Sequence, residues 1–239
     1  MATILCPLPD RDFDPTETAV PWKLLVEAGH RVVFATERGD VKPTCDPLML
    51  TGVIFGQLGA EPEPKKFYEE MAASEEIAKP IPWAGLDVYA FDALLLPGGH
   101  APGMRQYLGS EDLQRVIAAF WATGKPVAAI CHGVLPLARA DVLRGKKTTC
   151  LPKYMERTAY MLTAWKVGRY YRTYDAYVED EVRAALASPD DFVRGPRVLS
   201  RRGTREDDSP AMVVEDGAYV SARWPGDAYL FAKRFIAKL

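Results

Sequence analysis

Residues 126–133 read Pro-Val-Ala-Ala-Ile-Cys-His-Gly, and this stretch decides the fold class. Its first five residues are apolar with no polar alternation, which predicts a short strand covered on both faces, as in a parallel sheet. The strand ends abruptly at Cys131, and a helix is predicted to begin at His132. Ala129 and Gly133 are small enough to permit the sharp turn of a nucleophile elbow around that cysteine. The stretch therefore predicts a strained cysteine at the carboxyl edge of a parallel sheet, where open α/β folds bind ligands.

Strand and helix patterns alternate on both sides of this junction. Apolar or β-branched runs predict strands at 3–5, 31–36, 93–96 and 126–130, and helical spacing predicts helices at 111–122 and 132–140. Another helix is predicted to start at Asp14-Pro15-Thr16, with Asp14 or Thr16 as its cap. Residues 212–221 predict a hairpin, and residues 226–238 predict a closing helix. This order predicts an α/β fold with a mostly parallel sheet and helices on both faces.

Residues from about 40 to 85 interrupt the alternation. Prolines at positions 43, 47, 62, 64, 80 and 82 punctuate helical pieces such as residues 65–73. The segment is too long for a plain connection, so it is expected to form an inserted, lid-like part of one domain that spans residues 1–239.

Charge and cysteine usage exclude several functional classes. Positive and negative residues are nearly balanced, at 30 and 32, and are interspersed, so no nucleic-acid partner is expected. The basic residues of 201–205 are followed at once by three acids and are interpreted as a solvated loop. No leader pattern opens the chain and no apolar run could span a bilayer, so we expect a cytoplasmic protein without a membrane partner. Four cysteines without a paired motif, and only three histidines, predict free thiols and no metal site.

Cys131 is the candidate nucleophile. At an elbow its thiol faces the positive end of the following helix, which is expected to lower its pKa. Gly98 and Gly99 follow the preceding predicted strand, and the amides of Gly99 and His132 could form an oxyanion hole. The alternatives are a plain tight turn at the two glycines and an inert core thiol. The elbow favours the functional interpretation.

Three motifs together resemble the ThiJ/PfpI superfamily, also known as the DJ-1/PfpI group. They are Pro-Gly-Gly-His at 97–100, Ala-Ile-Cys-His-Gly at 129–133 and Ser-Ala-Arg-Trp-Pro-Gly-Asp at 221–227. The resemblance covers nearly the whole chain and implies a class I glutamine amidotransferase-like fold, which is a flavodoxin-like three-layer sandwich. The inserted segment looks more like the heat-shock chaperone and glyoxalase III branch, whereas the C-terminal segment looks closer to PfpI-type members.

The resemblance also implies residue roles. Cys131 would be the nucleophile or oxidation-sensitive thiol, and His132 a proton shuttle. Glu17 matches the family's buried glutamate, although without the resemblance it reads as a helix-end charge. Glu156, after a Gly-Lys segment, is carried over as the residue that orients His132, and His100 could line the pocket mouth. No cofactor is implied, and a homodimer would be in keeping with the family.

Three functions are compatible with this site. The first is a glutathione-independent glyoxalase that converts a small 2-oxoaldehyde such as methylglyoxal to lactate, or a related deglycase-type stress-protection enzyme. The second is a PfpI-type cysteine peptidase or amidase, which needs a wider cleft. The third is a non-enzymatic stress chaperone or redox sensor based on an accessible thiol. A glutamine amidotransferase is excluded, because its late catalytic histidine has no counterpart beyond His132.

Overall fold

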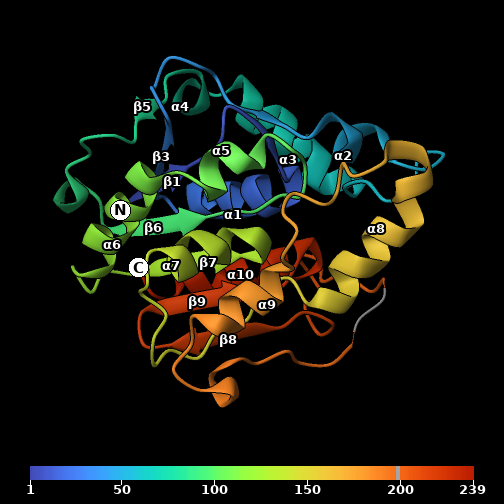
Figure 1. The fold of residues 1–239 in the computed structure, drawn as a ribbon. Coiled ribbons are helices and arrows are strands. Elements are labelled where there is room, and N and C mark those ends of the chain that lie inside the picture. Colours follow the sequence, from blue (N-terminus) through green and yellow to red (C-terminus); the bar gives the residue numbers. More distant parts are fainter. Residues whose placement is uncertain (198–199) are drawn as a thin grey trace.

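The computed structural model describes residues 1–197 and 200–239. Within them a seven-stranded sheet has the order β5-β3-β1-β6-β7-β9-β8, and all neighbouring strands are parallel except β8 and β9. The strands are β1 Thr3–Pro7, β3 Arg31–Thr36, β5 Ile81–Pro82, β6 Ala93–Leu96, β7 Val127–Ile130, β8 Val213–Asp216 and β9 Tyr219–Ala222. The predicted α/β class, the mostly parallel sheet and the flavodoxin-like layering are confirmed (Figure 1).

Helices cover both faces of the sheet. One layer holds α1 (Pro15–Glu27), α3 (Pro62–Ala73) and α10 (Ala228–Ile236), in which α1 packs against both of the others. In Figure 1, α5 (Met104–Leu108), α6 (Glu111–Trp121), α7 (Leu135–Arg139) and α9 (Val178–Ala184) lie on the opposite face. Shorter elements are β2 Arg11–Phe13, β4 Thr44–Cys45, α2 Pro47–Thr51, α4 Glu75–Ala78 and the 3₁₀ turns Val88–Ala90, Pro189–Asp191 and Pro225–Asp227; α8 is Lys153–Val167.

Helix α6 illustrates how sequence produces these layers. Its apolar residues Leu113, Ile117 and Phe120 recur at helical spacing and are fully buried against the core. Ser110 caps the helix by accepting a hydrogen bond from the Leu113 amide at 3.1 Å. Strands β6 and β7 lack any polar position, and all of their residues are buried. They form the centre of the core, directly before the loops that carry the predicted site.

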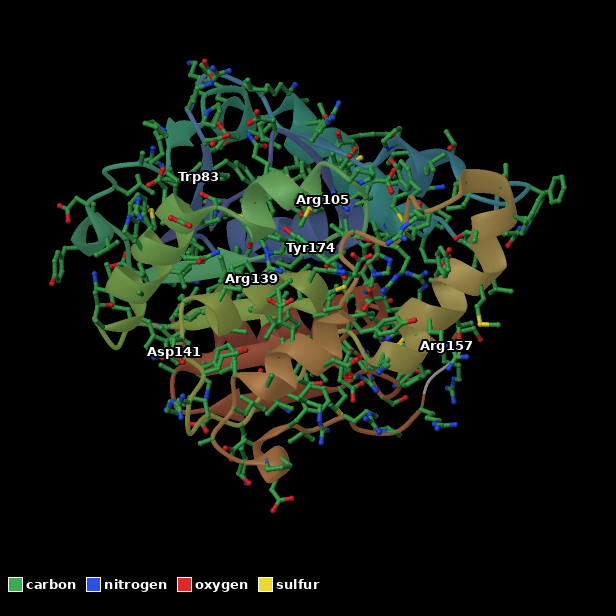
Figure 2. The ribbon with its side chains drawn as sticks, in the orientation of Figure 1. Trp83, Arg105, Arg139, Asp141, Arg157 and Tyr174 are labelled. Atoms are coloured by element: carbon green, nitrogen blue, oxygen red, sulfur yellow. The ribbon has the colours of Figure 1, made fainter. Side chains whose placement is uncertain are left out.

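Polar contacts join the helices on the front face. The Tyr174 ring centroid lies 4.4 Å from Arg139 Cζ and 5.7 Å from Arg105 Cζ. Figure 2 labels these three residues. Arg139 of α7 also donates two hydrogen bonds to Glu181 of α9, at 2.7 and 3.1 Å. These contacts fix α7, the helix that follows the cysteine, against its neighbours.

The helix expected at 132–140 has two parts. Residues Cys131–Val134 form a 3₁₀ turn, and α7 follows at Leu135–Arg139. The amide of Leu135 donates to the carbonyl of His132, and Pro136 has no amide with which to make the next α-helical bond. The junction is therefore tighter than an ideal helix start.

The segment of residues 40–85 contributes both to the core and to the cavity wall. Its β5 is the sheet edge beside β3, and Met71 and Ile77 are fully buried in the core. Its other part, from Asp46 to Glu61, contributes seven of the residues that line the cavity described below. Among the described residues, no helix is both long and apolar enough to cross a bilayer.

Candidate active site

Cys131 lies at the turn between β7 and the 3₁₀ segment, in the left-handed backbone region with φ 59°. For a residue with a side chain this conformation costs on the order of 1–3 kcal/mol and marks functional sites. A Cβ added to Gly133 would lie 2.1 Å from the carbonyl oxygen of Leu96, so only glycine fits there. The structure thus has the strained elbow that the small residues around Cys131 predict.

Helix α1 delivers Glu17 to this elbow. The Asp14 side chain caps the helix by accepting from the amides of Thr16 at 2.8 Å and Glu17 at 3.1 Å. The Asp14 amide donates to the Gly98 carbonyl at 2.9 Å, and the Gly98 amide donates to Glu17 Oε2 at 3.0 Å. These bonds tie the helix start to the glycine loop after β6.

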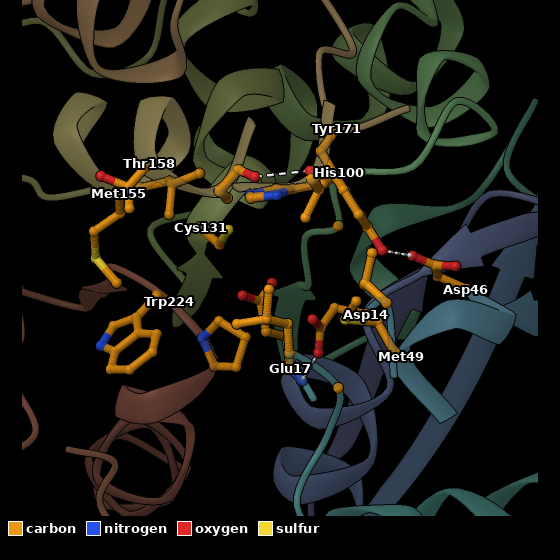
Figure 3. Close-up of a pocket in the computed structure, with 18 of the residues that line it drawn as sticks. Asp14, Glu17, Asp46, Met49, His100, Cys131, Met155, Thr158, Tyr171 and Trp224 are labelled. Carbon is orange, nitrogen blue, oxygen red and sulfur yellow. Dashed lines mark hydrogen bonds between the residues drawn. The ribbon is translucent and has the colours of Figure 1, made fainter. Parts of the chain in front are cut away.

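Glu17 and Cys131 form a buried acid–thiol pair (Figure 3). Glu17 is fully buried, and its Oε1 has no hydrogen-bond partner among the described residues. Burial and the charge of Asp14 raise the pKa of Glu17 well above its usual range, although a hydrogen bond with the Cys131 thiol opposes this. Burial and Glu17 likewise raise the pKa of Cys131, which is 2% exposed, while the His132 amide lowers it. The helix field that sequence reasoning considered is therefore outweighed by burial, and the pair favours states in which one member keeps its proton.

Two histidines flank the thiol. His132 Nδ1 lies 3.5 Å from Cys131 Sγ, and the His132 and His100 rings meet edge to face with centroids 4.5 Å apart. Burial lowers the pKa of His132 well below its usual range and that of His100 to about 4. Both rings are therefore neutral near neutral pH and can accept a proton. His100 lines the cavity beside Cys131, as expected, whereas His132 is not among the lining residues.

The glycine loop packs directly on the elbow. A Cβ on Gly98 would lie 2.7 Å from the amide nitrogen of His132 and 2.7 Å from Glu17 Oε2. Gly99 lines the cavity next to Cys131. The two segments that should supply the oxyanion hole thus lie together, and the hole formed by the Gly99 and His132 amides remains a prediction.

Glu156 is buried but makes other contacts than the one expected. Its Oε1 accepts from Arg172 Nη1 at 3.2 Å, and its Oε2 accepts from the amide of Val178, the first residue of α9, at 3.1 Å. Among the described residues, no hydrogen bond joins it to His132. Burial raises the pKa of Glu156 to about 7, and the charge of Arg172 also lowers the pKa of His132. Arg172 is the group through which Glu156 could influence His132, so the orienting role remains a prediction.

A cavity of about 390 Å³ opens in front of Cys131. In Figure 3, Cys131 and Glu17 lie at its centre, between Met155 and Trp224 on one side and Tyr171 on the other. Helices α8 and α2 supply apolar walls; the apolar lining side chains include Met49, Val53, Leu151, Met155, Ala159 and Leu162. This volume is at the lower end of small-molecule sites.

The polar lining of the cavity is strongly acidic, and sequence reasoning missed most of it. The lining acids are Asp12, Asp14, Glu17, Asp46 and Glu61. Tyr170 and Tyr171 donate to the two oxygens of Asp46 at 3.0 and 3.1 Å, and burial raises the pKa of Asp14 to about 6. Arg202 is the only Lys or Arg in the described lining, although its stretch was interpreted as a solvated loop. Of the lining acids, sequence reasoning singled out Glu17 through the family resemblance and Asp14 as a helix cap, and it assigned no role in the cavity to Asp12 or Glu61.

Comparisons with known proteins identify the family. Residues 8–196 match the family model described as ThiJ/PfpI family-like. An uncharacterized protein of Schizosaccharomyces pombe is 30% identical over 175 residues, which are 70% of this chain and 65% of that protein. Deglycase PfpI of Pyrococcus furiosus is 27% identical over 228 residues, covering 95% of this chain and 94% of that one.

Solved structures show the same fold. The Candida albicans glyoxalase III structure aligns with TM-score 0.68 at 19% identity, covering 100% of this chain and 97% of that one. The Francisella tularensis Rapid Encystment Protein of 24 kDa aligns with TM-score 0.71 at 15% identity, covering 100% and 99%. With the elbow, the buried glutamate and the family model in agreement, the chain belongs to the ThiJ/PfpI family.

Proposed function

We propose that the chain is a cysteine-dependent stress-protection enzyme of the deglycase type, and that it converts a small 2-oxoaldehyde such as methylglyoxal to the 2-hydroxy acid without glutathione. The observation that carries this proposal is the buried pair of Cys131 and Glu17 at a small cavity, with two neutral histidines close to the Cys131 sulfur. Relatives named as deglycases in Pyrococcus abyssi and Pyrococcus furiosus support the class of enzyme.

The reaction begins with proton transfer within the buried pair. Cys131 loses its proton to Glu17 or His132, and the thiolate attacks the aldehyde carbon to give a hemithioacetal. The amides of Gly99 and His132 would hold the oxygen that gains charge. A protonated Glu17 can then return its proton to that oxygen, so its raised pKa suits it to act as an acid at neutral pH.

The second half moves a hydrogen between adjacent carbons. A base, Glu17 or His132, removes the proton from the hemithioacetal carbon to give an enediol, and the proton returns to the neighbouring carbon. This converts the hemithioacetal to a thioester, with no net change in redox state. Water then cleaves the thioester, which releases the 2-hydroxy acid and regenerates the Cys131 thiol. These reaction steps need no metal ion and no organic cofactor.

The cavity favours this reaction over the two alternatives. A peptidase must bind an extended chain, whereas a cavity of about 390 Å³ has the size of a small-molecule site. A redox-sensor cysteine is normally accessible and has a low pKa, whereas Cys131 is 2% exposed and burial raises its pKa. A small neutral aldehyde fits the cavity, and in the proposed reaction Glu17 or His132 takes the thiol proton that the raised pKa retains.

The test measures methylglyoxal loss and lactate formation in glutathione-free buffer. We expect the wild type to form lactate and Cys131→Ala to form none. Cys150→Ala is the matched control, because Cys150 is a fully buried thiol that does not line the cavity. Equal lactate formation by the wild type and Cys131→Ala would disprove the mechanism. Aldehyde loss without lactate would indicate that thiol or arginine side chains only form adducts with the aldehyde.

A further inference from the structure

Three metal-ligating side chains converge beside the cavity. One nitrogen of His100, one nitrogen of His132 and Cys131 Sγ all lie within 4.8 Å of one another. Among the described residues, this Cys-His-His cluster is the one group of three or more His, Cys, Asp and Glu ligand atoms so arranged. It holds two of the three histidines in the chain. The third, His30, lies elsewhere and accepts a hydrogen bond from the Ala2 amide.

The distance between two of the ligand atoms fits tetrahedral coordination of a metal ion. Zinc binds thiolate sulfur at about 2.3 Å and imidazole nitrogen at about 2.1 Å, so a tetrahedral angle places the two ligand atoms about 3.6 Å apart. Cys131 Sγ and His132 Nδ1 are 3.5 Å apart. The His100 nitrogen lies within 4.8 Å of the other two atoms, so zinc binding would require its partly exposed ring to move closer to them. Two of the three ligands therefore already have the required separation.

The surroundings supply a fourth position. Cys131 and His100 both line the cavity, so an ion held between them would face it. Glu17 faces the same sulfur and has a fully buried Oε1 without a hydrogen-bond partner among the described residues. A carboxylate oxygen or a water can complete a site with three nitrogen and sulfur ligands. One thiolate with two imidazoles suits zinc and disfavours magnesium or calcium.

We propose that His100, Cys131 and His132 bind one Zn²⁺ ion reversibly, and that the ion blocks the nucleophile. Binding replaces the Cys131 S–H bond with a sulfur–zinc bond and releases one proton. The sulfur lone pair is then no longer available to attack a carbonyl carbon. Sequence reasoning predicted no metal site, because the ligands come from two separate loops and form no spaced motif. Zinc binding does not depend on the proposed reaction, whereas the inhibition of lactate formation by zinc rests on it.

Binding is measured first, without any substrate. The chelator-treated full chain is titrated with Zn²⁺ in competition with a chromophoric chelator, and Co²⁺ is used as a spectroscopic probe. The wild type should bind one ion per chain and show a thiolate-to-cobalt charge-transfer band. We expect His100→Ala to bind at least about tenfold more weakly and Cys131→Ala to lose the band. His30→Ala and Cys150→Ala are the controls and should match the wild type.

The outcomes separate this proposal from the proposed function. Absence of one-to-one binding, or equal binding by the wild type and His100→Ala, would overturn the zinc site; circular dichroism checks that each variant is folded. A wild type that binds zinc but forms no lactate would support the site and reject the reaction. Where lactate is formed, one equivalent of Zn²⁺ should abolish it, and the chelator should restore it. Undiminished lactate formation by the zinc-loaded protein would refute the blocking role.

Discussion

Gly133→Ala should damage the elbow by a direct clash with backbone atoms. The added Cβ would lie 2.1 Å from the Leu96 carbonyl oxygen and 2.8 Å from both the Leu96 carbonyl carbon and the Pro97 oxygen. All three are backbone atoms at the end of β6, so no side-chain rotation can relieve the overlap. Relief requires a shift of at least about 1 Å between β6 and the elbow, since Cβ atoms essentially never lie closer than 3.0 Å to another heavy atom. Overpacking of this kind typically costs about 1–3 kcal/mol, and we expect the upper end.

The effect appears in both stability and activity. About 3 kcal/mol corresponds to a fall in Tm of about 6–12 °C for a domain of this size. The same shift moves the Gly98 loop relative to Cys131, so lactate formation should fall by about 100-fold, the usual penalty for a displacement of about 1 Å. Gly124→Ala is the control, because nothing lies within 4 Å of its added Cβ, although its φ of 71° adds modest strain. A Gly133→Ala protein with unchanged Tm and activity would refute the claim that glycine is required by this packing.

Three further predictions concern buried polar groups. Glu17→Gln keeps the shape and the acceptor for Gly98 but cannot transfer a proton, so lactate formation should fall about 10²–10⁴-fold, while Tm rises because a desolvated acid is removed. Unchanged activity would contradict its acid–base role. Burial raises the pKa of Glu156 to about 7, so the folded state retains a proton that the unfolded chain loses above about pH 4.5. The free energy of unfolding should therefore fall by up to about 3 kcal/mol as the pH rises from about 4.5 to 7. Urea unfolding should show that Glu156→Gln flattens this decline, and an equal slope in both proteins would disprove it. Tyr171→Phe removes one donor from buried Asp46 and should cost about 1.5–3 kcal/mol in urea unfolding, whereas an unchanged midpoint would mean that the bond contributes nothing.

The sequence predicted those elements that have strong local patterns. The predicted bounds of β3 and β6 agree with the structure, because runs of β-branched or apolar residues have few other conformations available in a folded core. The small elements within the inserted segment were not predicted. β4 and β5 have two residues each, and their pairing depends on strands that are distant in sequence. A pattern of two residues carries no periodicity.

The same distinction between local sequence patterns and long-range packing applies to the site. The grouping of Cys131, Gly98 and His100 follows from motifs at strand ends, since parallel strands bring their carboxyl ends to one edge. Glu17 lies in α1, and only the family resemblance predicted its place beside them. The electrostatics do not follow, because the pKa of Cys131 depends on how completely other segments cover it. The two tyrosines on Asp46 and the position of Arg202 likewise come from segments without periodic patterns. Local sequence therefore locates the nucleophile, whereas long-range packing determines its charge state.

The acidic lining bears on which molecules the cavity can turn over. Asp14 and Asp46 lie in its wall, and burial raises the pKa of each. A neutral 2-oxoaldehyde enters without an electrostatic penalty, whereas a 2-hydroxy acid leaves as an anion that these acids repel in their ionised form. Arg202 is the one cation in the described lining, and its guanidinium already lies 3.5 Å from Glu61 and over the Trp224 ring. Under the proposed reaction, product release is therefore electrostatically favoured. Arg202→Ala should weaken inhibition by added lactate without raising the KM for methylglyoxal. A higher KM would contradict this and place Arg202 among the groups that bind substrate.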